Sequence, residues 1–462
     1  MVGVPHSTGC ARCRERRIKC DKVTPECSQC RRYGRPCPGY RRTFRFQDEG
    51  PGLERRHLQS ARRAFKPSIT SSERSVPDAA EMVRDSALAM ISRYSSMSED
   101  YGNIGSPTSI LLENQHIQCF ADFIRTAFPT MYYHNRFRAT DRLDFPSYVI
   151  QDVGSHIFQD AAVACLSSVY LAYLSQDSAL LKTSRQMYAQ SLKEVAKALQ
   201  TPDAMSDAML STMMMLSVYE MYAQTTDNAW VIHADGVRRL MVSRGAQSHA
   251  QGMARSCYIA YRGFLVATAV YKGKPCFLDE EEWQQLSIQV GLEDSQKPAE
   301  WSSSTQPAEL VFREIVKCPR YLSEALEVAY LFPSPSVTSA IPDLIQRIQA
   351  TRQDLLEKSA DLRASMDADS PPREDAMAGE SWPSLILQGA EHTLSILADL
   401  TSRLERAAAR PEDSTALSFR VVSELDRGPP APPSNRIDFR AVTWLDRIAS
   451  SMGMSGTAIV SD

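Results

Sequence analysis

Most of the chain repeats apolar residues at the spacing of amphipathic helices. From about residue 110 onward, apolar positions recur three and four residues apart, and strand-like alternation is scarce. This periodicity predicts a large all-α domain over residues 108–462, because each helix must bury its apolar face against its neighbours. The segments with this pattern are 112–127, 161–174, 180–199, 207–223, 228–242, 254–271, 308–316, 321–331, 341–357, 385–404 and 439–452.

Three stretches lack this periodicity. Residues 366–381 contain two adjacent prolines and residues 426–435 contain four, so we expect both to be loops within the helical domain. Residues 47–107 are polar and rich in serine, which predicts a largely disordered linker. No heptad repeat is sustained after the N-terminal segment, so no coiled coil is evident and a homodimer stays possible but unsupported.

Charge is divided unevenly along the chain. The whole sequence has 52 Lys and Arg against 55 Asp and Glu, a formal net charge of −3. Residues 1–80 hold 18 basic and 8 acidic residues, a net +10, so residues 81–462 carry −13. A basic N-terminal segment on an acidic body predicts that this segment binds a polyanion such as nucleic acid.

Several classes of protein are not expected. No uninterrupted apolar run approaches the roughly 18 residues of a membrane helix, and the N-terminus lacks the apolar core of a signal peptide. We therefore expect no membrane partner and an intracellular, reducing environment, where clustered cysteines bind metal more often than they form disulfides. Dinucleotide-binding, phosphate-loop, zinc-protease and serine-hydrolase motifs are missing, so we expect no catalytic residues and no enzymatic activity.

Six of the 11 cysteines lie within 28 residues near the N-terminus. Their spacing is C-x2-C-x6-C-x6-C-x2-C-x6-C, which is one C-x2-C-x6-C unit used twice. A tetrahedral zinc site takes four ligands, so six cysteines complete two sites if two thiolates bridge both ions. The spacing leaves open a knot of three disulfides, which a reducing environment disfavours, and a single four-cysteine site with two spare thiols. The candidate ligands are Cys10, Cys13, Cys20, Cys27, Cys30 and Cys37.

This segment resembles the fungal zinc binuclear cluster family of transcription factors. The resemblance covers the six cysteines, the basic run that follows Cys13, and Pro25, two residues before Cys27. It implies a small zinc-stabilised DNA-binding domain over residues 6–46 that holds two Zn²⁺ ions, with Cys10 and Cys27 bridging them. It also implies that the partner is double-stranded DNA with CGG-type triplets and that the protein acts in the nucleus.

The basic residues between the cysteines are the candidate DNA contacts. We expect a short helix, opened by the first C-x2-C pair, to enter the major groove, where guanine offers two acceptors to Arg or Lys. Arg17, at a position where relatives often have Lys, is expected to be the main base reader and Arg16 the second. Arg14 and Lys19 are expected to hold phosphate. Without the cysteines, such a run would equally suit a solvated charged surface or a nuclear-import signal. In the second half the corresponding contacts are Arg31, Arg32 and Arg35.

These features predict a sequence-specific transcription factor of RNA polymerase II genes. The helical body is expected to regulate the head, to contact coactivators or co-regulators, or to sense a metabolite. The resemblance extends to pathway-specific regulators of secondary metabolic gene clusters. The rival hypothesis is an interaction or scaffold protein that does not bind DNA and whose zinc head docks protein or RNA.

Two patterns in the body predict core packing rather than ligand binding. Six methionines between residues 205 and 221 suit a pliable core, with a ligand pocket as the alternative. The pattern W-x2-H-x2-G-x3-L-x3-R-G, residues 230–245, resembles a motif in the regulatory domain of some fungal zinc-cluster factors. We expect His233 to be packed and hydrogen-bonded, Gly236 to permit close helix approach and Gly245 to end the helix. The remaining cysteines are expected to be buried thiols: Cys119, Cys165, Cys257, Cys276 and Cys318.

Overall fold

The chain divides into two compact units, Met1–Arg74 and Ser75–Asp462, which are described separately. The structure is a computed structural model. It describes residues 9–23, 26–38, 116–130, 138, 143–175, 177–299, 301–332, 338–369, 381–410, 417–430 and 443–461. The expected linker, residues 47–107, therefore lies outside the described residues. Within the first unit the structure describes two five-residue helices, α1 (Ala11–Glu15) and α2 (Ser28–Arg32).

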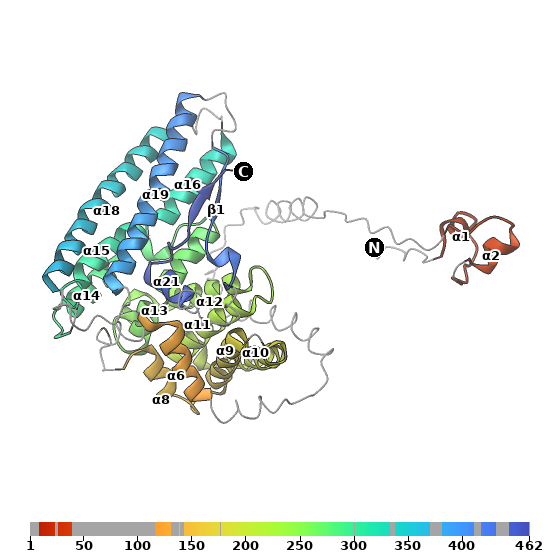
Figure 1. Ribbon diagram of the computed structural model, residues 1–462, viewed down its shortest axis with the longest axis horizontal. Coiled ribbons are helices and arrows are strands. Elements are labelled where there is room, and N and C mark those ends of the chain that lie inside the picture. The colour runs from red at the N-terminus through yellow and green to blue at the C-terminus, as the bar shows by residue number, and fades with distance from the viewer. Residues whose placement is uncertain are drawn as a thin grey trace, which may run out of the picture. The chain divides into compact units, whose positions relative to one another are not determined.

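One group of helices in the second unit packs around a buried centre, seen in orange to green in Figure 1. Two of them, α11 and α13, are buried on nearly all sides, as expected for helices inside a large core. Asp207 is the only residue of α11 that is not buried. The helices of this group are α6 (His116–Ala127), α8 (Phe145–Gln151), α9 (Ile157–Ser175), α10 (Ser178–Ala198), α11 (Asp207–Ala223), α12 (Ala229–Arg244) and α13 (Gly252–Tyr271).

A second group forms a bundle whose two longest helices, α18 and α19, lie side by side (Figure 1). Its helices are α14 (Glu281–Ser295), α15 (Thr305–Ile315), α16 (Cys318–Leu331), α18 (Ile341–Asp369) and α19 (Trp382–Ala409). The C-terminal segment adds a short helix, α21 (Trp444–Ser450), and one antiparallel pair of strands, β1 (Arg420–Val422) and β2 (Ala458–Val460). The prediction of an all-α body is confirmed, since these two three-residue strands are the only ones in the described residues.

Short 3-10 helices connect several of these elements. They are η2 (Pro202–Met205), η3 (Ala246–His249), η4 (Phe277–Asp279) and η5 (Leu425–Arg427). Side-chain caps fix where the longer helices begin. The Asp177 carboxylate accepts hydrogen bonds from the backbone N–H groups of Ala179 and Leu180 at the start of α10. Ser206 accepts one from Met209 at the start of α11.

The structure adds elements that apolar periodicity did not predict. Helix α8 has only seven residues, too few for the spacing to repeat. Helix α14 is mostly polar and buries a narrow stripe formed by Trp283, Leu286 and Val290. Helix α18 continues to Asp369, so the first four residues of the loop expected at 366–381 are helical. Most of that loop and residues 431–435 of the second one lie outside the described residues, while η5 already covers residues 426 and 427.

Helix α9 meets the length and composition of a membrane span. Its window Ile157–Leu174 has 18 residues and a mean hydropathy of 1.4. The window contains polar residues, which is why a search for uninterrupted apolar runs passes over it. The buried core helix of a globular domain meets the same criteria, and 61% of this window is buried inside the unit, where α9 packs against α10 and α11. The finding is weak evidence for a membrane.

The expected core roles of the methionines and of the 230–245 pattern are confirmed, apart from Met205, which lies on η2 and is 39% exposed. The five methionines on α11 are buried. On α12, His233 is 2% exposed and its Nε2 lies 2.5 Å from the hydroxyl of Tyr188. Burial lowers the pKa of His233 to about 3, so the ring is neutral at physiological pH. Gly245 ends α12 with a φ of 76°.

All eleven cysteines lie among the described residues, and all are free thiols. In the helical unit, burial was expected for five of them. Cys165, Cys257, Cys276 and Cys318 are buried, which confirms the expectation, whereas Cys119 is only half-buried.

The C-terminal segment contacts the two halves of the helical unit through glycines. A Cβ atom on Gly263 of α13 would lie 2.2 Å from the carbonyl oxygen of Ala449. One on Gly389 of α19 would lie 2.2 Å from the carbonyl oxygen of Ser451. Both neighbours are backbone atoms, which cannot rotate away as a side chain can. The end of α21 and the residue that follows it therefore pack against α13 and α19 only because these two positions lack a side chain.

We expect Gly263→Ala to lower the free energy of unfolding by about 2 kcal/mol, because overpacking outweighs the higher helix propensity of alanine. The matched control is Gly236→Ala on α12, where the new Cβ meets only the terminal methyl of Met213, at 2.7 Å. That methyl can move, so we expect a change within about 1 kcal/mol. Urea unfolding followed by circular dichroism measures both. Equal stability of the two variants would show that the backbone contact with Ala449 is unimportant.

Candidate zinc centre and nucleic-acid interface

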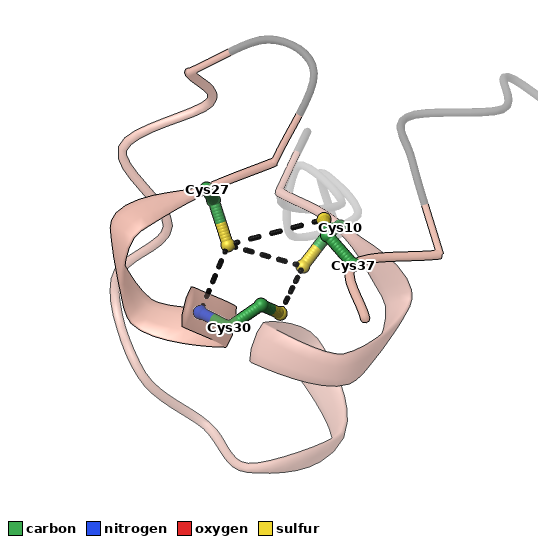
Figure 2. Close-up of side chains that lie close together, drawn as sticks. All are labelled: Cys10, Cys27, Cys30 and Cys37. Carbon is green, nitrogen blue, oxygen red and sulfur yellow. Dashed lines mark hydrogen bonds between the residues drawn. The ribbon is translucent and has the colours of Figure 1, made fainter. Parts of the chain in front are cut away.

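The six N-terminal cysteines gather into two four-sulfur groups that share two members. Cys10, Cys27, Cys30 and Cys37 form one group, and Cys10, Cys13, Cys20 and Cys27 form the other. Within each group all sulfurs lie within 4.8 Å of one another. Figure 2 shows the first group, in which the Cys10 and Cys27 sulfurs are 3.8 Å apart. The shared residues are the first and fourth cysteines of the sequence.

Local structure repeats along with the sequence. Each C-x2-C pair opens a five-residue helix, and the second cysteine of the pair donates its backbone N–H to the sulfur of the first. This N–H to sulfur distance is 3.4 Å from Cys13 to Cys10 and 3.4 Å from Cys30 to Cys27. The duplicated C-x2-C-x6-C unit of the sequence is therefore a duplicated structural unit, and each copy faces the other across Cys10 and Cys27.

Each helix ends two residues after its second cysteine, and a residue with left-handed backbone follows two positions later. In the second copy of the repeat this residue is Gly34, with a φ of 67°, and in the first copy it is Arg17, with a φ of 55°. The backbone N–H of Ile18 then bonds to the carbonyl of Cys13 at 3.0 Å, which is the closing bond of a Schellman cap. This early ending turns the chain back so that Cys20 reaches the sulfur group.

This cap corrects the expected placement of the basic run. Helix α1 ends at Glu15, so Arg16 and Arg17 lie in the turn and Lys19 lies beyond it. These three residues are exposed. Arg14 lies on α1, and its side chain is outside what the structure describes. In the second half the exposed basic residues are Arg31, Arg32 and Arg35.

Side-chain contacts link the two copies. The guanidinium carbon of Arg16 lies 3.7 Å from the ring centroid of Tyr33, the residue at the equivalent position of the other copy. Arg12 donates a hydrogen bond to the carbonyl of Pro36. The Asp21 carboxylate accepts the backbone N–H of Ser28 at 3.1 Å and 3.2 Å. Sequence reasoning missed these contacts, although the matching offsets of Arg16 and Tyr33 within the repeat were a usable signal.

The sulfurs fit zinc. Burial raises the pKa of Cys30 to about 12 and also raises the pKa of Cys13, so both thiols need a compensating cation to ionise. The backbone N–H of Cys10 lowers the pKa of Cys20 to about 7. A coordinating metal ion deprotonates such thiols outright. Zn²⁺ prefers four ligands in a tetrahedron, and each of the two groups offers four sulfurs. Six cysteines suffice for two such sites because two of the sulfurs are counted in both groups.

Comparison with known families gives two matches. The fungal Zn(2)-Cys(6) binuclear cluster domain matches residues 8–46. The fungal specific transcription factor domain matches residues 120–394, which is more than half of the chain.

Two relatives match individually. An uncharacterized protein of Emericella nidulans is 27% identical over 395 residues, covering 77% of this chain and 83% of its own length. The Zn(2)-C6 fungal-type transcription factor afumD of Aspergillus fumigatus is 60% identical over 30 residues, which is 6% of this chain and 8% of that protein. No solved structure gives a significant match.

A six-cysteine head with two four-sulfur groups, followed by a helical body of this type, defines a class of fungal regulator. The chain belongs to the fungal-specific transcription factor family with a Zn(2)-Cys(6) binuclear cluster domain. The cofactor of such a head is a pair of zinc ions.

Proposed function

We propose that this protein is a nuclear, sequence-specific transcription factor that reads CGG-type triplets in double-stranded DNA at RNA polymerase II genes. The observation that carries the proposal is the pair of four-sulfur groups beside exposed basic residues in both copies of the repeat. The six N-terminal cysteines would hold the two zinc ions, and Cys10 and Cys27 would serve both because they belong to both four-sulfur groups.

Electrostatics support contact with a polyanion. Residues 1–50 carry 12 basic and 5 acidic residues, formally +7. Six thiolates and two Zn²⁺ together add −2, which leaves about +5 on the folded head. Because such a charge releases counterions from the phosphate backbone, we expect DNA binding to weaken steeply as salt rises.

The roles of the basic side chains follow from their placement. Arg17 stands exposed at the turn that closes α1, so its guanidinium can reach a guanine edge. Arg16 is stacked on Tyr33, which orders its guanidinium before DNA arrives and makes it the second base contact. We assign Arg14, Lys19, Arg31 and Arg32 to the phosphate backbone.

The helical unit is then the regulatory domain. We propose the division of the chain into a zinc cluster domain at 6–46, a linker at 47–107 and a regulatory domain at 108–462. We further propose that the regulatory domain contacts coactivators or co-regulators and that the protein controls a secondary metabolic gene cluster. The family supports a regulator rather than an enzyme.

Binding-site selection with the full-length zinc-loaded protein and random duplex DNA tests the function. Enrichment of CGG-type triplets is the expected result. Enrichment of no sequence, together with capture of protein or RNA through the zinc head, would replace the proposal by the scaffold alternative.

Replacing Arg17 by glycine removes the main base contact while keeping the cap, because Gly34 already fills the equivalent left-handed position. We expect affinity for a CGG duplex to fall about tenfold or more, while affinity for unrelated duplexes changes little. Fluorescence anisotropy titrations on both duplexes measure this. The comparison variant, Lys19→Ala, should weaken binding to both duplexes alike. An equal loss on both duplexes in Arg17→Gly would instead make Arg17 a phosphate contact.

A further inference from the structure

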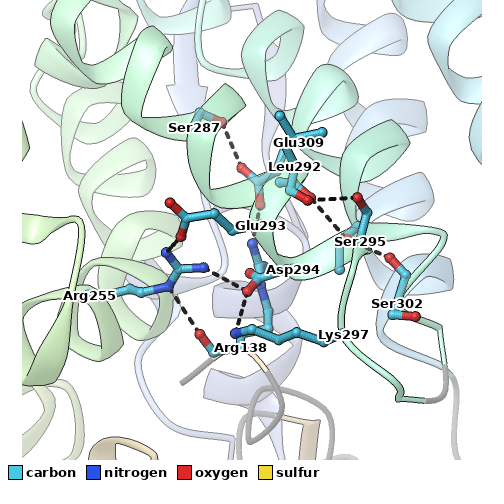
Figure 3. A network of polar contacts seen from close by, with 12 residues as sticks. Arg138, Arg255, Ser287, Leu292, Glu293, Asp294, Ser295, Lys297, Ser302 and Glu309 are labelled. Atoms are coloured by element: carbon cyan, nitrogen blue, oxygen red, sulfur yellow. Dashed lines mark hydrogen bonds and ion pairs between the residues drawn. The ribbon is translucent and has the colours of Figure 1, made fainter. Parts of the chain in front are cut away.

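Three arginines are buried in the helical unit, where a charged side chain normally stays at the surface. Arg138, Arg255 and Arg262 are 2%, 0% and 1% exposed. Their partners are two equally buried carboxylates, Asp294 of α14 and Glu309 of α15. Figure 3 shows how Arg138 and Arg255 meet at Asp294. Three positive and two negative charges leave this buried cluster with one excess positive charge.

The carboxylates of this cluster are saturated. Glu309 accepts hydrogen bonds from both terminal nitrogens of Arg262, from Arg138 at 2.6 Å and from Ser287 at 2.6 Å. Asp294 accepts from Arg138 at 2.8 Å and from Arg255 at 2.6 Å. At the rim, Glu293 and Lys297 add one charge of each sign, so the excess remains positive.

A cavity of about 30 Å³ opens beside this cluster. We call it the polar cavity; its walls include Thr130, Arg138, Arg262, Trp382, Ile386 and Met452. The Nε of Arg262 and the Nε1 of Trp382 are buried and have no hydrogen-bond partner. No carboxylate lines the cavity in the part of the chain that the structure describes. The nearby carboxylate of Asp446 accepts the backbone N–H of Thr130 at 3.0 Å. Among the residues that the structure describes, the wall of the polar cavity therefore has two N–H groups without an acceptor and no carboxylate that could accept them.

A second cavity of about 30 Å³ shares one lining residue with the first. This apolar cavity is lined by phenylalanines and methionines, including Phe120, Phe123, Met214 and Met215. Both cavities are lined by Ala260 of α13, which is partly exposed. A donor-rich cavity and an apolar cavity therefore meet at one small side chain.

We propose that the two cavities together bind a small monocarboxylate that carries an apolar group. The carboxylate occupies the polar cavity, where it accepts the N–H groups of Arg262 and Trp382 and neutralises the excess positive charge. The apolar group enters the apolar cavity, whose methionines adapt to its shape. Unpaired buried donors are otherwise destabilising, so a bound acceptor accounts for them directly. The acidic character of residues 81–462 as a whole does not oppose this, because the cluster is locally positive.

The test uses the full-length zinc-loaded protein and three probes sized to cavities of about 30 Å³: butyrate, its neutral amide butyramide, and formate, which lacks the alkyl chain. Isothermal titration calorimetry measures affinity. We expect butyrate to bind at least about tenfold more tightly than either comparison compound, because only it supplies both a charged acceptor and an apolar group. At about ten times its dissociation constant it should raise the melting temperature by about 2 °C or more. Equal affinity for the acid and the amide, or no binding of the acid, would overturn the proposal.

Two variants test whether the probe binds in these cavities. Ala260→Leu fills the junction of the cavities without removing any member of the charged cluster, and should abolish binding. Trp382→Phe keeps the ring but removes the unpaired donor, so the preference for acid over amide should narrow severalfold. The matched control is Ala329→Leu on α16, another partly buried alanine, which lines neither cavity and should bind as the parent does. Unchanged binding in Ala260→Leu would contradict the site. The outcome is independent of the proposed DNA recognition, since every readout concerns the helical unit.

Discussion

Replacing Cys27 by alanine is expected to release both zinc ions and to abolish DNA binding. The Cys27 sulfur belongs to both four-sulfur groups and lies 3.8 Å from Cys10, 3.7 Å from Cys13 and 4.0 Å from Cys37. Its loss leaves three sulfurs in each group, below the four that a structural zinc site requires. Among the residues of the head that the structure describes, the only apolar cluster is formed by the six cysteines. Metal binding and folding are therefore expected to be the same event.

Two substitutions make this prediction specific. Cys37 belongs to one group only, so Cys37→Ala should leave one complete set of sulfurs and about one zinc per chain. Cys119→Ala removes a half-buried thiol of the helical unit and should keep both ions. Zinc per chain is measured by inductively coupled plasma mass spectrometry, and DNA binding by anisotropy. If Cys27→Ala retained two zinc ions, Cys27 could not be a bridging ligand.

Replacing Glu309 by alanine is expected to lower the free energy of unfolding by about 3–5 kcal/mol. The substitution leaves the guanidinium groups of Arg262 and Arg138 in the core without the carboxylate that both contact. An uncompensated buried charge is strongly destabilising. Urea unfolding of the full-length protein, followed by the helical signal in circular dichroism, gives the value. The control is Glu391→Ala, whose pair with Arg363 is 3.0 Å long but about half exposed, and which should change stability by less than about 1 kcal/mol. Similar losses of stability in Glu309→Ala and Glu391→Ala would mean that the buried ion pairs of Glu309 contribute no more than an exposed pair.

The same residue predicts a dependence on pH. Burial alone would raise the pKa of Glu309, but Arg262 and Arg138 outweigh it and lower the pKa from 4.5 to about 2. Because the pKa of Glu309 is lower in the folded protein than in the unfolded chain, its ionisation stabilises the fold at pH values above about 4.5. This stabilisation is lost as the pH falls from about 4.5 toward 2. We expect Glu309→Gln to lose less stability than the parent over this interval, measured by unfolding at stepped pH. If the stability of the parent and of Glu309→Gln fell equally over this pH interval, groups other than Glu309 would cause the loss of stability in acid.

The zinc head was largely predictable from the sequence. Its six cysteines lie within 28 consecutive residues and repeat a single unit, so spacing restricts which sulfurs can meet. Spacing did not reveal that the first helix ends at Glu15, because the ending depends on a left-handed backbone at Arg17, a residue type that seldom adopts it. The stacking of Arg16 on Tyr33 was likewise hidden, since it joins two copies of the repeat in space.

In the body, sequence periodicity was sufficient for the helical class and for most of the long helices, because an apolar face recurs locally along each of them. Periodicity could not assign partners to the buried charges. Arg138 lies 156 residues from Asp294 and 171 from Glu309, and nothing in the local sequence distinguishes it from an exposed arginine. Burial, pairing and the cavity beside Arg262 depend on contacts between helices distant in sequence. The six-cysteine group and the positive charge of the head are therefore evident from the sequence alone, whereas the buried charged cluster and its cavities appear only when the helices pack.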